Sequence, residues 1–585
     1  MLLILRMYCF RHLIFAFITF IFTLVSTSHA QLSKGNLILL DRGLQIQGLV
    51  TPDNWFHLDT YSNANYTAVN FQWESTGNLG PISTFVGSTP GFPWARWVSD
   101  ETSMPTMGSG QTGNGAPFSR TDEIPYMSQL MDLCLGDEWN LNDDATRDRL
   151  VNWFVSVRIN FPNTILYHNN WGSQILDSQL ADFYTRAQPD MLCFDNYPWQ
   201  SVYDTSQPNN IGAPIPGPPT NLYDDLRRYR EHARAAGIPL GIYRQTFHSV
   251  EVGRVYRDPS PSELRLDTFA AMAFNAKFLT DFTYNTGASS LFTNLGGGSG
   301  DSVTNSNGLY AEITDVNKRA RNFGKALTRL TPITIEGYAG YTTSIMIIRG
   351  TNSSGTLTPI PIGFLADQDT ASAIYTDWVY QRNDPFLNGW TVTNKAGIKN
   401  SGLRGDVIIS WFKAMDEGFD GTNYNNQIYY MVVNGLTDPT GTAADCMQEI
   451  KLNFANSPPA TAVLLDPVSG LLQTNTMTDI GSGKRQLVLD LNGGDAVLFK
   501  LQTGAPFVGF FPPPAAKLTI QKTNWQTINI QGSLGFRYQL ETTTSLSPAN
   551  WTVLTNLVFP SSSFQFQDTN SSNSGSRFYR VIAMP

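Results

Sequence analysis

The chain has 585 residues, a formal net charge of −9 at pH 7 and only 15% charged residues, against roughly 25% in an average soluble protein. So long a chain exceeds one hydrophobic core, and we expect several domains. The acidic balance excludes nucleic acid as an expected partner, because phosphate binding needs a basic surface. Its four cysteines show no metal-binding spacing, so we expect no metal, no cofactor and no disulfide framework, with Cys134, Cys193 and Cys446 as buried apolar residues.

The first 30 residues have the pattern of an export signal. Arg6 and Arg11 precede an apolar run at 13–25, and a small-residue segment at 28–30 predicts cleavage before Gln31. A membrane anchor is the alternative, but a spanning helix needs roughly 20 apolar residues. We therefore expect a secreted protein, extracellular or periplasmic, without a membrane span after cleavage.

From about residue 38 to 330, short apolar runs alternate with helical patterns. The intervening helices are expected at 144–159, at 223–236, at 261–275, which Ser262 can cap, and at 315–330, which closes the domain. The alternation predicts an α/β fold, a (β/α)₈ TIM barrel. A doubly wound open sheet is the alternative, but residues 51–53, after the first run, lack its phosphate-binding glycine turn. The eight predicted strands are 44–50, 68–74, 95–100, 131–138, 164–169, 191–197, 240–247 and 278–284.

Beyond the barrel the pattern changes to alternating strands separated by turn residues, which predicts a β-sandwich domain. Strands are expected at 343–349, 406–412, 427–434, 449–454, 462–465, 486–491 and 496–501, and in a small C-terminal all-β module at 536–542 and 577–582. The predicted organisation is a signal peptide at 1–30, a barrel at 31–340, a β-sandwich at 341–503, a proline-rich linker at 504–516 and a β-module at 517–585.

The strongest chemical signal is the segment in which the fourth strand ends, Gly136-Asp137-Glu138-Trp139. Alternation along a strand puts Gly136 and Glu138 on one face and Asp137 on the other. At the mouth of a barrel, a partly desolvated Glu138 has a raised pKa and can donate a proton to a leaving oxygen. Trp139 offers a flat face to a sugar ring. The alternative role, an acidic helix cap, is already filled by Asp143.

Polar and aromatic residues also end other predicted strands. Asp195, Tyr197 and Trp199 follow the sixth strand and offer hydrogen bonds and flat apolar faces to a sugar, a solvated turn being the alternative. Gln245 ends the seventh strand and Glu251 follows it. Asp137 and Gln245 are also expected to bind substrate. The remaining residues of this set are Trp73 and Glu74, which end the second strand, and Tyr284, which ends the eighth.

These segments resemble clan A glycoside hydrolases, especially bacterial beta-galactosidase-type barrels. The resemblance rests on Gly-Asp-Glu at 136–138, on the passages at 257–265 and 270–284, and on the barrel-closing segment 316–327. It covers about 38–330 and extends more loosely to 340–503, while 578–581 resembles small terminal β-modules of secreted bacterial proteins. It implies a secreted hydrolase with Glu138 as proton donor.

The sequence departs from the clan at two positions. The clan places Asn before its acid/base Glu, where this chain has Asp137, and a nucleophilic Glu at the end of the seventh strand, where it has Gln245. A retaining mechanism then needs another carboxylate. Asp195 and Glu251 are the candidates. Glu74 is a weaker one.

Three functions are therefore compatible with the sequence. The first is hydrolysis of an O-glycosidic bond in an external oligo- or polysaccharide, with Glu138 as general acid. The second is a non-catalytic carbohydrate-binding protein on a degenerate barrel, which Gln245 motivates. The third is an exported scaffold whose β-modules carry the function. The separation of the carboxyl groups decides the stereochemistry of hydrolysis, about 5–5.5 Å for retention and roughly 6.5–9.5 Å for inversion.

Overall fold

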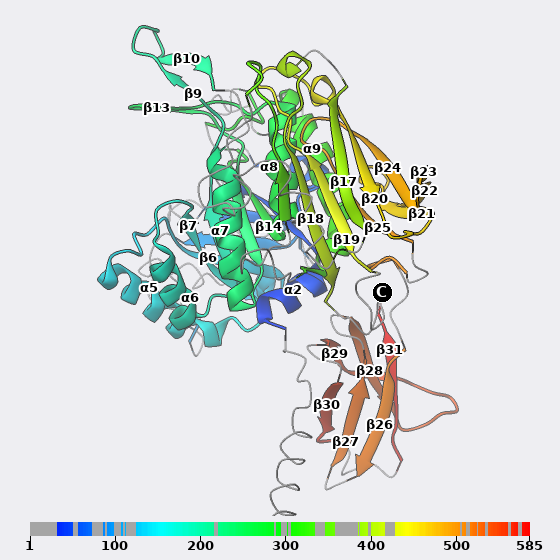
Figure 1. Cartoon of the computed structure of the whole chain (residues 1–585). Helices are drawn as coiled ribbons and strands as arrows, with labels where there is room; N and C mark the ends of the chain where they lie inside the picture. The colour runs from blue at the N-terminus through cyan, green and yellow to red at the C-terminus, as the bar shows by residue number, and fades with distance from the viewer. Residues whose placement is uncertain are drawn as a thin grey trace, which may run out of the picture. The chain divides into compact units, whose positions relative to one another are not determined.

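The computed structural model describes the chain with gaps, and the chain folds into two compact units, Lys34–Pro512 and a second that contains Pro513–Pro585. Each unit is described by itself (Figure 1). The described residues are 32–50, 56–72, 86–87, 91–98, 107–108, 111–112, 124–215, 220–285, 288–293, 301, 306–333, 345–356, 384, 386–395, 399–415, 427–502, 506–510, 515–522, 525–532, 536–559, 563–570 and 576–584.

Eight parallel strands close into a barrel in the order β1-β14-β11-β8-β7-β6-β3-β2. Each of the eight predicted strands corresponds to one of them, and the predicted TIM barrel is confirmed. The strands are β1 (Gln45–Val50), β2 (Ala68–Gln72), β3 (Trp94–Val98), β6 (Leu130–Asp137), β7 (Ile165–Trp171), β8 (Leu192–Asp195), β11 (Leu240–Gln245) and β14 (Ala276–Phe282).

The strands form a barrel because their residues are buried on both faces. One set of side chains, including Cys134, Tyr167, Cys193 and Tyr243, packs together in one cluster, and a larger second cluster includes apolar residues of the helices. Parallel strands between such layers need apolar side chains on both faces. The three described cysteines are free and buried, as predicted.

The helices around the barrel follow the predicted periodicity. They are α2 (Lys34–Arg42), α3 (Leu58–Asn63), α5 (Asp144–Val157), α6 (Asp177–Ala187), α7 (Thr220–Ala236), α8 (Pro261–Ala273) and α9 (Gly308–Leu327). Asp143 caps α5 by accepting from the backbone N–H of Thr146. The capping residue predicted for α8, Ser262, was wrong by two positions. Ser260 is the cap, and it forms a reciprocal capping box with Glu263. Among the described residues, no helix is both long and apolar enough to cross a membrane.

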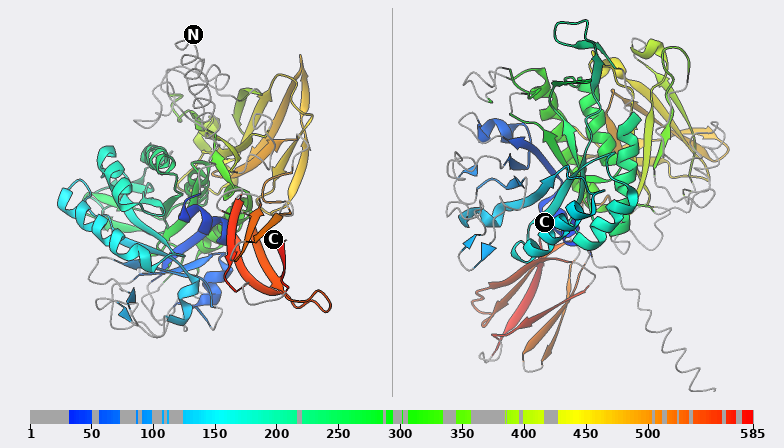
Figure 2. Two further views of the ribbon diagram at one scale, coloured as in Figure 1. Left: turned by 90° about the horizontal axis from the view of Figure 1, so that it is seen from below. Right: turned by 90° about the vertical axis from the view of Figure 1, so that its left-hand side faces the viewer.

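Two antiparallel sheets follow the barrel in the same unit, so the predicted β-sandwich region is present (Figures 1 and 2). Helix α8 contacts β18 and β19 of the larger sheet. One sheet has the order β15-β18-β19-β25-β21-β22 with β16 on β18, and the other β17-β20-β24-β23. The strands are β15 (Leu330–Pro332), β16 (Ile345–Ile348), β17 (Leu387–Asn394), β18 (Val407–Ala414), β19 (Tyr429–Asn434), β20 (Gln448–Phe454), β21 (Thr461–Leu465), β22 (Leu472–Thr476), β23 (Thr478–Gly481), β24 (Lys484–Leu491) and β25 (Ala496–Leu501).

Arg265 of α8 joins the barrel helices to this β-region. Its guanidinium forms ion pairs with Glu312 and Asp315 of α9, and with Asp495 before β25 at 2.7 Å. Because Arg265 and Asp495 are buried, neither charge has water to replace a lost partner. The network therefore fixes the β-region against α8 and α9.

The C-terminal unit is all-β, as predicted. Its two three-stranded antiparallel sheets have the orders β26-β27-β30 and β29-β28-β31. The strands are β26 (Lys517–Lys522), β27 (Gln526–Gln531), β28 (Arg537–Thr543), β29 (Thr552–Val558), β30 (Ser563–Asp568) and β31 (Phe578–Ala583).

Candidate active site

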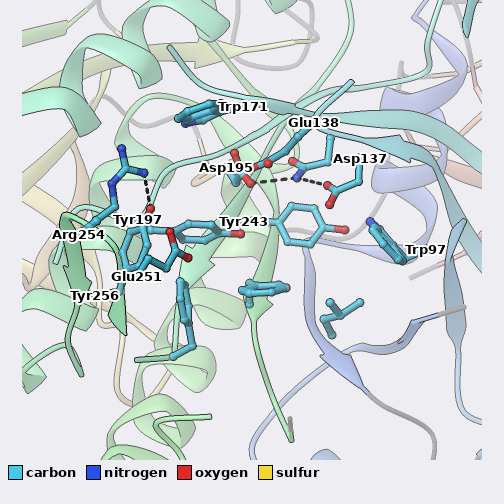
Figure 3. Close-up of a pocket in the computed structure, with 14 residues that line it drawn as sticks. Trp97, Asp137, Glu138, Trp171, Asp195, Tyr197, Tyr243, Glu251, Arg254 and Tyr256 are labelled. Atoms are coloured by element: carbon cyan, nitrogen blue, oxygen red, sulfur yellow. Dashed lines mark hydrogen bonds between the residues drawn. The ribbon is translucent and has the colours of Figure 1, made fainter. Parts of the chain in front are cut away.

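A pocket of about 430 Å³ opens where the carboxyl ends of the barrel strands meet, the face on which barrel enzymes place their active sites. Figure 3 shows its side chains. The lining residues are Leu49, Trp97, Asp137, Glu138, Asn169, Trp171, Asp195, Tyr197, Tyr243, Phe247, Glu251, Arg254, Tyr256 and Phe282. All three predicted catalytic carboxylates, Glu138, Asp195 and Glu251, are among them.

The end of β6 brings two acids into the pocket instead of one. The pairing of β6 with β7 shifts between Cys134 and Asp137, and Gly136 and Glu138 have left-handed φ angles of 77° and 49°. The alternation of side chains between the two faces of β6 therefore ends before Asp137. The prediction that Asp137 faces away from Glu138 was wrong, since both side chains line the pocket.

Gly136 allows this turn of the backbone. A Cβ atom at this position would lie 3.1 Å from the Trp139 ring and 3.2 Å from Nδ1 of His168, in a conformation that strains residues other than glycine. The His168 ring is fully buried and bonds through Nδ1 to the carbonyl of Leu135 at 2.8 Å. Its burial lowers the pKa of His168 to about 4, so this ring supports β6 as a neutral group.

Asp195 is a buried acid that contacts a second acid. It is 3% exposed at the end of β8. Burial raises the pKa of Asp195 well above its ordinary value, and the Glu138 carboxyl, hydrogen-bonded to it, raises that pKa further. Glu138 is the more exposed of these two acids. The buried Asp195 is therefore the acid whose protonated form the fold favours.

Asn169, on β7, connects Asp195 to the third acid. Its Nδ2 donates to Asp137 Oδ1 at 2.8 Å and to Asp195 Oδ2 at 3.3 Å. Its backbone carbonyl accepts from the N–H of Glu138 at 2.9 Å. Asn169 is 2% exposed, and its own Oδ1 and the Oδ1 of Asp195 have no hydrogen-bond partner among the described residues. One residue thus orients all three acids of this wall and leaves two acceptors for a bound ligand.

Glu251 lies on a separate wall, in a small sheet of order β10-β9-β13-β12 that projects from the strand ends. Its strands are β9 (Gln200–Tyr203), β10 (Ile211–Pro214), β12 (Ser249–Glu251) and β13 (Arg254–Tyr256). Glu251 pairs directly with Arg254 across the hairpin, and Arg254 donates to the Tyr256 hydroxyl at 2.6 Å. Figure 3 shows Glu251 apart from Asp137, Glu138 and Asp195, which gather on one side.

Aromatic rings form much of the remaining wall. Tyr197 contacts Phe247 at a centroid distance of 4.9 Å and Phe282 at 5.6 Å, and Phe247 contacts Tyr256 at 5.2 Å. Trp171, by contrast, is 40% exposed at the register position beside Asp195. An exposed indole at the rim of a pocket offers a face on which a sugar ring can stack.

Three aromatic residues predicted to bind substrate do not line the pocket. Trp139 packs on α5, against the Trp153 ring and beneath the guanidinium of Arg149. Trp199 is 1% exposed, and Tyr284 is fully buried. Their large rings stabilise the barrel core because burial of an aromatic side chain contributes more there than at a wet rim.

Gln245 also lies outside the pocket lining, and its amide has a structural explanation. Its Nε2 donates to the carbonyls of Trp199 at 3.0 Å, Arg257 at 2.8 Å and Phe247 at 3.4 Å, and its Oε1 accepts from the N–H of Trp199 at 2.9 Å. An ionised glutamate cannot donate to these carbonyls. An amide at 245 therefore fastens the loops beside the pocket.

Other positions complete the account of the predicted site. Trp73 and Glu74 lie outside the described residues. No group of three His, Cys, Asp or Glu side chains that could hold a metal occurs in the described part of the chain. Asn169 and Trp171 were not predicted as site residues, although Asn169 ends the fifth predicted strand and Trp171 follows it two positions later. Trp97, Tyr243, Arg254 and Tyr256 were not predicted either, and the last two lie on a hairpin that had no strong pattern.

No protein-family model and no curated protein matches the sequence. Solved structures are similar, among them the beta-galactosidase of the psychrophilic Marinomonas ef1, with 10% identity over 50% of this chain and 63% of that chain at a TM-score of 0.33. Alpha-galactosidase I from Mortierella vinacea is 11% identical over 79% of this chain and 98% of that chain, at a TM-score of 0.34. The chitinase from Chromobacterium violaceum ATCC 12472 is 12% identical over 47% of this chain and 98% of that chain, at a TM-score of 0.28. This chain spans 63% of the Marinomonas enzyme and 58% of a beta-galactosidase from Halorubrum lacusprofundi. The roles of individual residues in this chain rest on the geometry of the pocket.

Proposed function

We propose that this chain is an exported glycoside hydrolase that cleaves an O-glycosidic bond of an external oligo- or polysaccharide. The observation that carries the proposal is the gathering of Asp137, Glu138 and the buried Asp195 on one side of a pocket with aromatic walls. A carboxyl group beside the scissile bond can protonate the oxygen that leaves the sugar.

Glu138 is the proton donor in this mechanism. The neighbouring Asp195 is the buried acid whose raised pKa favours its protonated form. As the glycosidic C–O bond breaks, the proton moves from Glu138 to the leaving oxygen. Glu138, now ionised, then accepts a proton from the water that releases the sugar.

Asp137 is the carboxylate partner that the geometry favours. Since Asn169 Nδ2 binds one oxygen of Asp137 and one of Asp195, Asp137 lies on the same wall of the pocket as Asp195 and Glu138. Asp137 then attacks the anomeric carbon and forms the glycosyl ester. Glu251, on its separate wall, is the alternative base, and would activate a water molecule with inversion.

The charge of the pocket bears on the substrate. Four carboxyl groups line it, of which the buried Asp195 has a raised pKa, and Arg254 is the cation among the lining residues. The pocket is therefore negative, and an acidic sugar would be repelled. We propose a neutral or amino sugar as the residue bound next to the scissile bond.

The test compares Glu138→Gln with the wild type on a panel of aryl glycosides and polysaccharides. We expect kcat to fall by about 10²–10⁴, the usual contribution of a general acid, with the urea midpoint and sugar binding nearly unchanged. Glu231→Gln, on α7 outside the pocket, is the control. Full activity of Glu138→Gln would contradict the proposal, and a wild type that binds glycans without turnover would favour a binding protein. The anomeric configuration of the product, followed by NMR, separates Asp137 (retention) from Glu251 (inversion).

A further inference from the structure

A second hollow, of about 530 Å³, lies between α2 and α9 and shares no lining residue with the active site. Its charged lining is mostly cationic. Five lysine and arginine residues line it together with one acidic residue, Asp41. The five cations are Arg42, Lys318, Arg321, Lys325 and Arg329.

Three of these cations form a row on α9. Lys318, Arg321 and Lys325 are spaced by three and four residues, so they project from one face of the helix. All three are exposed, and none forms an ion pair with the described residues. The Lys325 ammonium lies 5.8 Å from the centre of the Phe510 ring. The row thus carries three positive charges that remain available to a ligand.

Arg42 closes the hollow from α2. Its guanidinium is half-buried, and Nη2 donates to the backbone carbonyl of Ser128 at 3.1 Å, which limits its motion. The chain as a whole has a net charge of −9. A concentrated positive region on an acidic protein attracts anions that the rest of the surface repels.

The dimensions of the row indicate the class of ligand. Seven residues of helix from Lys318 to Lys325 span about 10 Å, so the row presents its charges along a line that successive anionic groups of a chain can follow. We infer that this hollow binds a polyanionic glycan, through successive sulfate esters or uronate carboxylates. Nucleic acid is disfavoured because the chain as a whole carries a net charge of −9. This inference rests on the hollow alone and does not depend on the catalytic assignment.

The test measures binding of the full chain to dextran sulfate, polygalacturonate, uncharged dextran and single-stranded DNA by calorimetry at several salt concentrations. The first two probes separate sulfate esters from carboxylates. The variant is Lys318→Glu/Arg321→Glu/Lys325→Glu. The control for charge is Lys484→Glu, an exposed lysine on β24 outside the hollow, compared with Lys318→Glu alone. Urea midpoints of all variants confirm that they are folded.

We expect the wild type to bind at least one anionic glycan at least tenfold more tightly than dextran. The triple variant should weaken that binding at least 30-fold and reduce the slope of log K against log salt by about 2–3, the share of three released counterions. The inference is overturned if neither anionic glycan exceeds dextran, if Lys484→Glu weakens binding as much as Lys318→Glu, or if DNA binds as tightly as the better glycan.

Discussion

Asn169 offers a sharp test of the active site, because the chain contains a matched control beside it. The change is Asn169→Ala, which removes donation to Asp137 at 2.8 Å and to Asp195 at 3.3 Å. The backbone carbonyl that accepts from Glu138 remains, so the path of β6 is kept. The variant therefore isolates the effect of the amide on the carboxyl groups.

The magnitude follows from these two contacts. A hydrogen bond to a charged group contributes about 1.5–3 kcal/mol, and the longer contact to Asp195 adds less. At about 1.4 kcal/mol for each factor of ten, kcat/KM should fall by roughly 10- to 150-fold. The pH profile should shift as well, because the amide lowers the pKa of Asp195 and its loss raises that pKa further.

The control is Asn170→Ala on the same strand. Asn170 is also buried, and its amide donates at 2.7 and 3.3 Å, but to the backbone carbonyls of Cys193 and His168. Steady-state kinetics on the best aryl glycoside of the panel should show normal kcat/KM for this variant, with a urea midpoint reduced as much as in Asn169→Ala or more. Equal losses of kcat/KM in the two variants, or an Asn169→Ala enzyme within twofold of wild type, would refute the role of the amide.

Three further changes test other parts of the structure. Asp132 is fully buried and bonded to Gln47, and burial raises its pKa to about 8. The folded state therefore favours its protonated form, and the free energy of unfolding falls as pH rises from about 4 to 8. Asp132→Asn should remove this loss, which urea unfolding should show to be up to about 5 kcal/mol at pH 9. Trp171→Ala should raise KM about threefold to tenfold with an unchanged midpoint, because the ring is exposed. Arg265→Ala should cost about 3–5 kcal/mol, because it removes the 2.7 Å ion pair of the buried Asp495 and leaves that carboxylate with the longer contact of 3.6 Å to Arg319.

Each of these expectations has a distinct contrary result. A wild type whose stability is flat between pH 5 and 9 would contradict the buried, protonated state of Asp132. For Trp171→Ala, a change in kcat with KM unaltered would place the ring in the chemical step instead of binding. An Arg265→Ala variant as stable as the wild type would show that the β-region is held by apolar packing alone.

Much of the barrel was predictable from the sequence, because each strand is a short apolar run between helical patterns. β11, β14 and their neighbours are buried along nearly their whole length, and a run of apolar residues in the sequence predicts such a buried strand. The acids at the strand ends were also predictable as a group, since parallel strands deliver their carboxyl ends to one face.

The orientation of single side chains was not predictable by the same reasoning. Alternation assumes an unbroken strand, and the left-handed φ angles at Gly136 and Glu138 end it, so Asp137 joined the pocket unexpectedly. Trp139 was expected at a sugar but packs on α5. Gln245 occupies the position of the clan's nucleophile. Its structural role could not be predicted, because the backbone carbonyls that its amide binds lie on loops distant in sequence.

The same backbone break explains why the site depends on β7. A residue other than glycine with a positive φ costs about 1–3 kcal/mol unless its surroundings hold it. For Glu138 that support is the hydrogen bond from its N–H to the carbonyl of Asn169, the residue whose side chain also binds Asp137 and Asp195. Backbone strain in β6 and the placement of three acids are therefore stabilised by one residue of the neighbouring strand. A substitution that shifts β7 along β6 should disturb proton donation and the partner carboxylate together, because Asn169 binds the backbone of Glu138 and the side chain of Asp137.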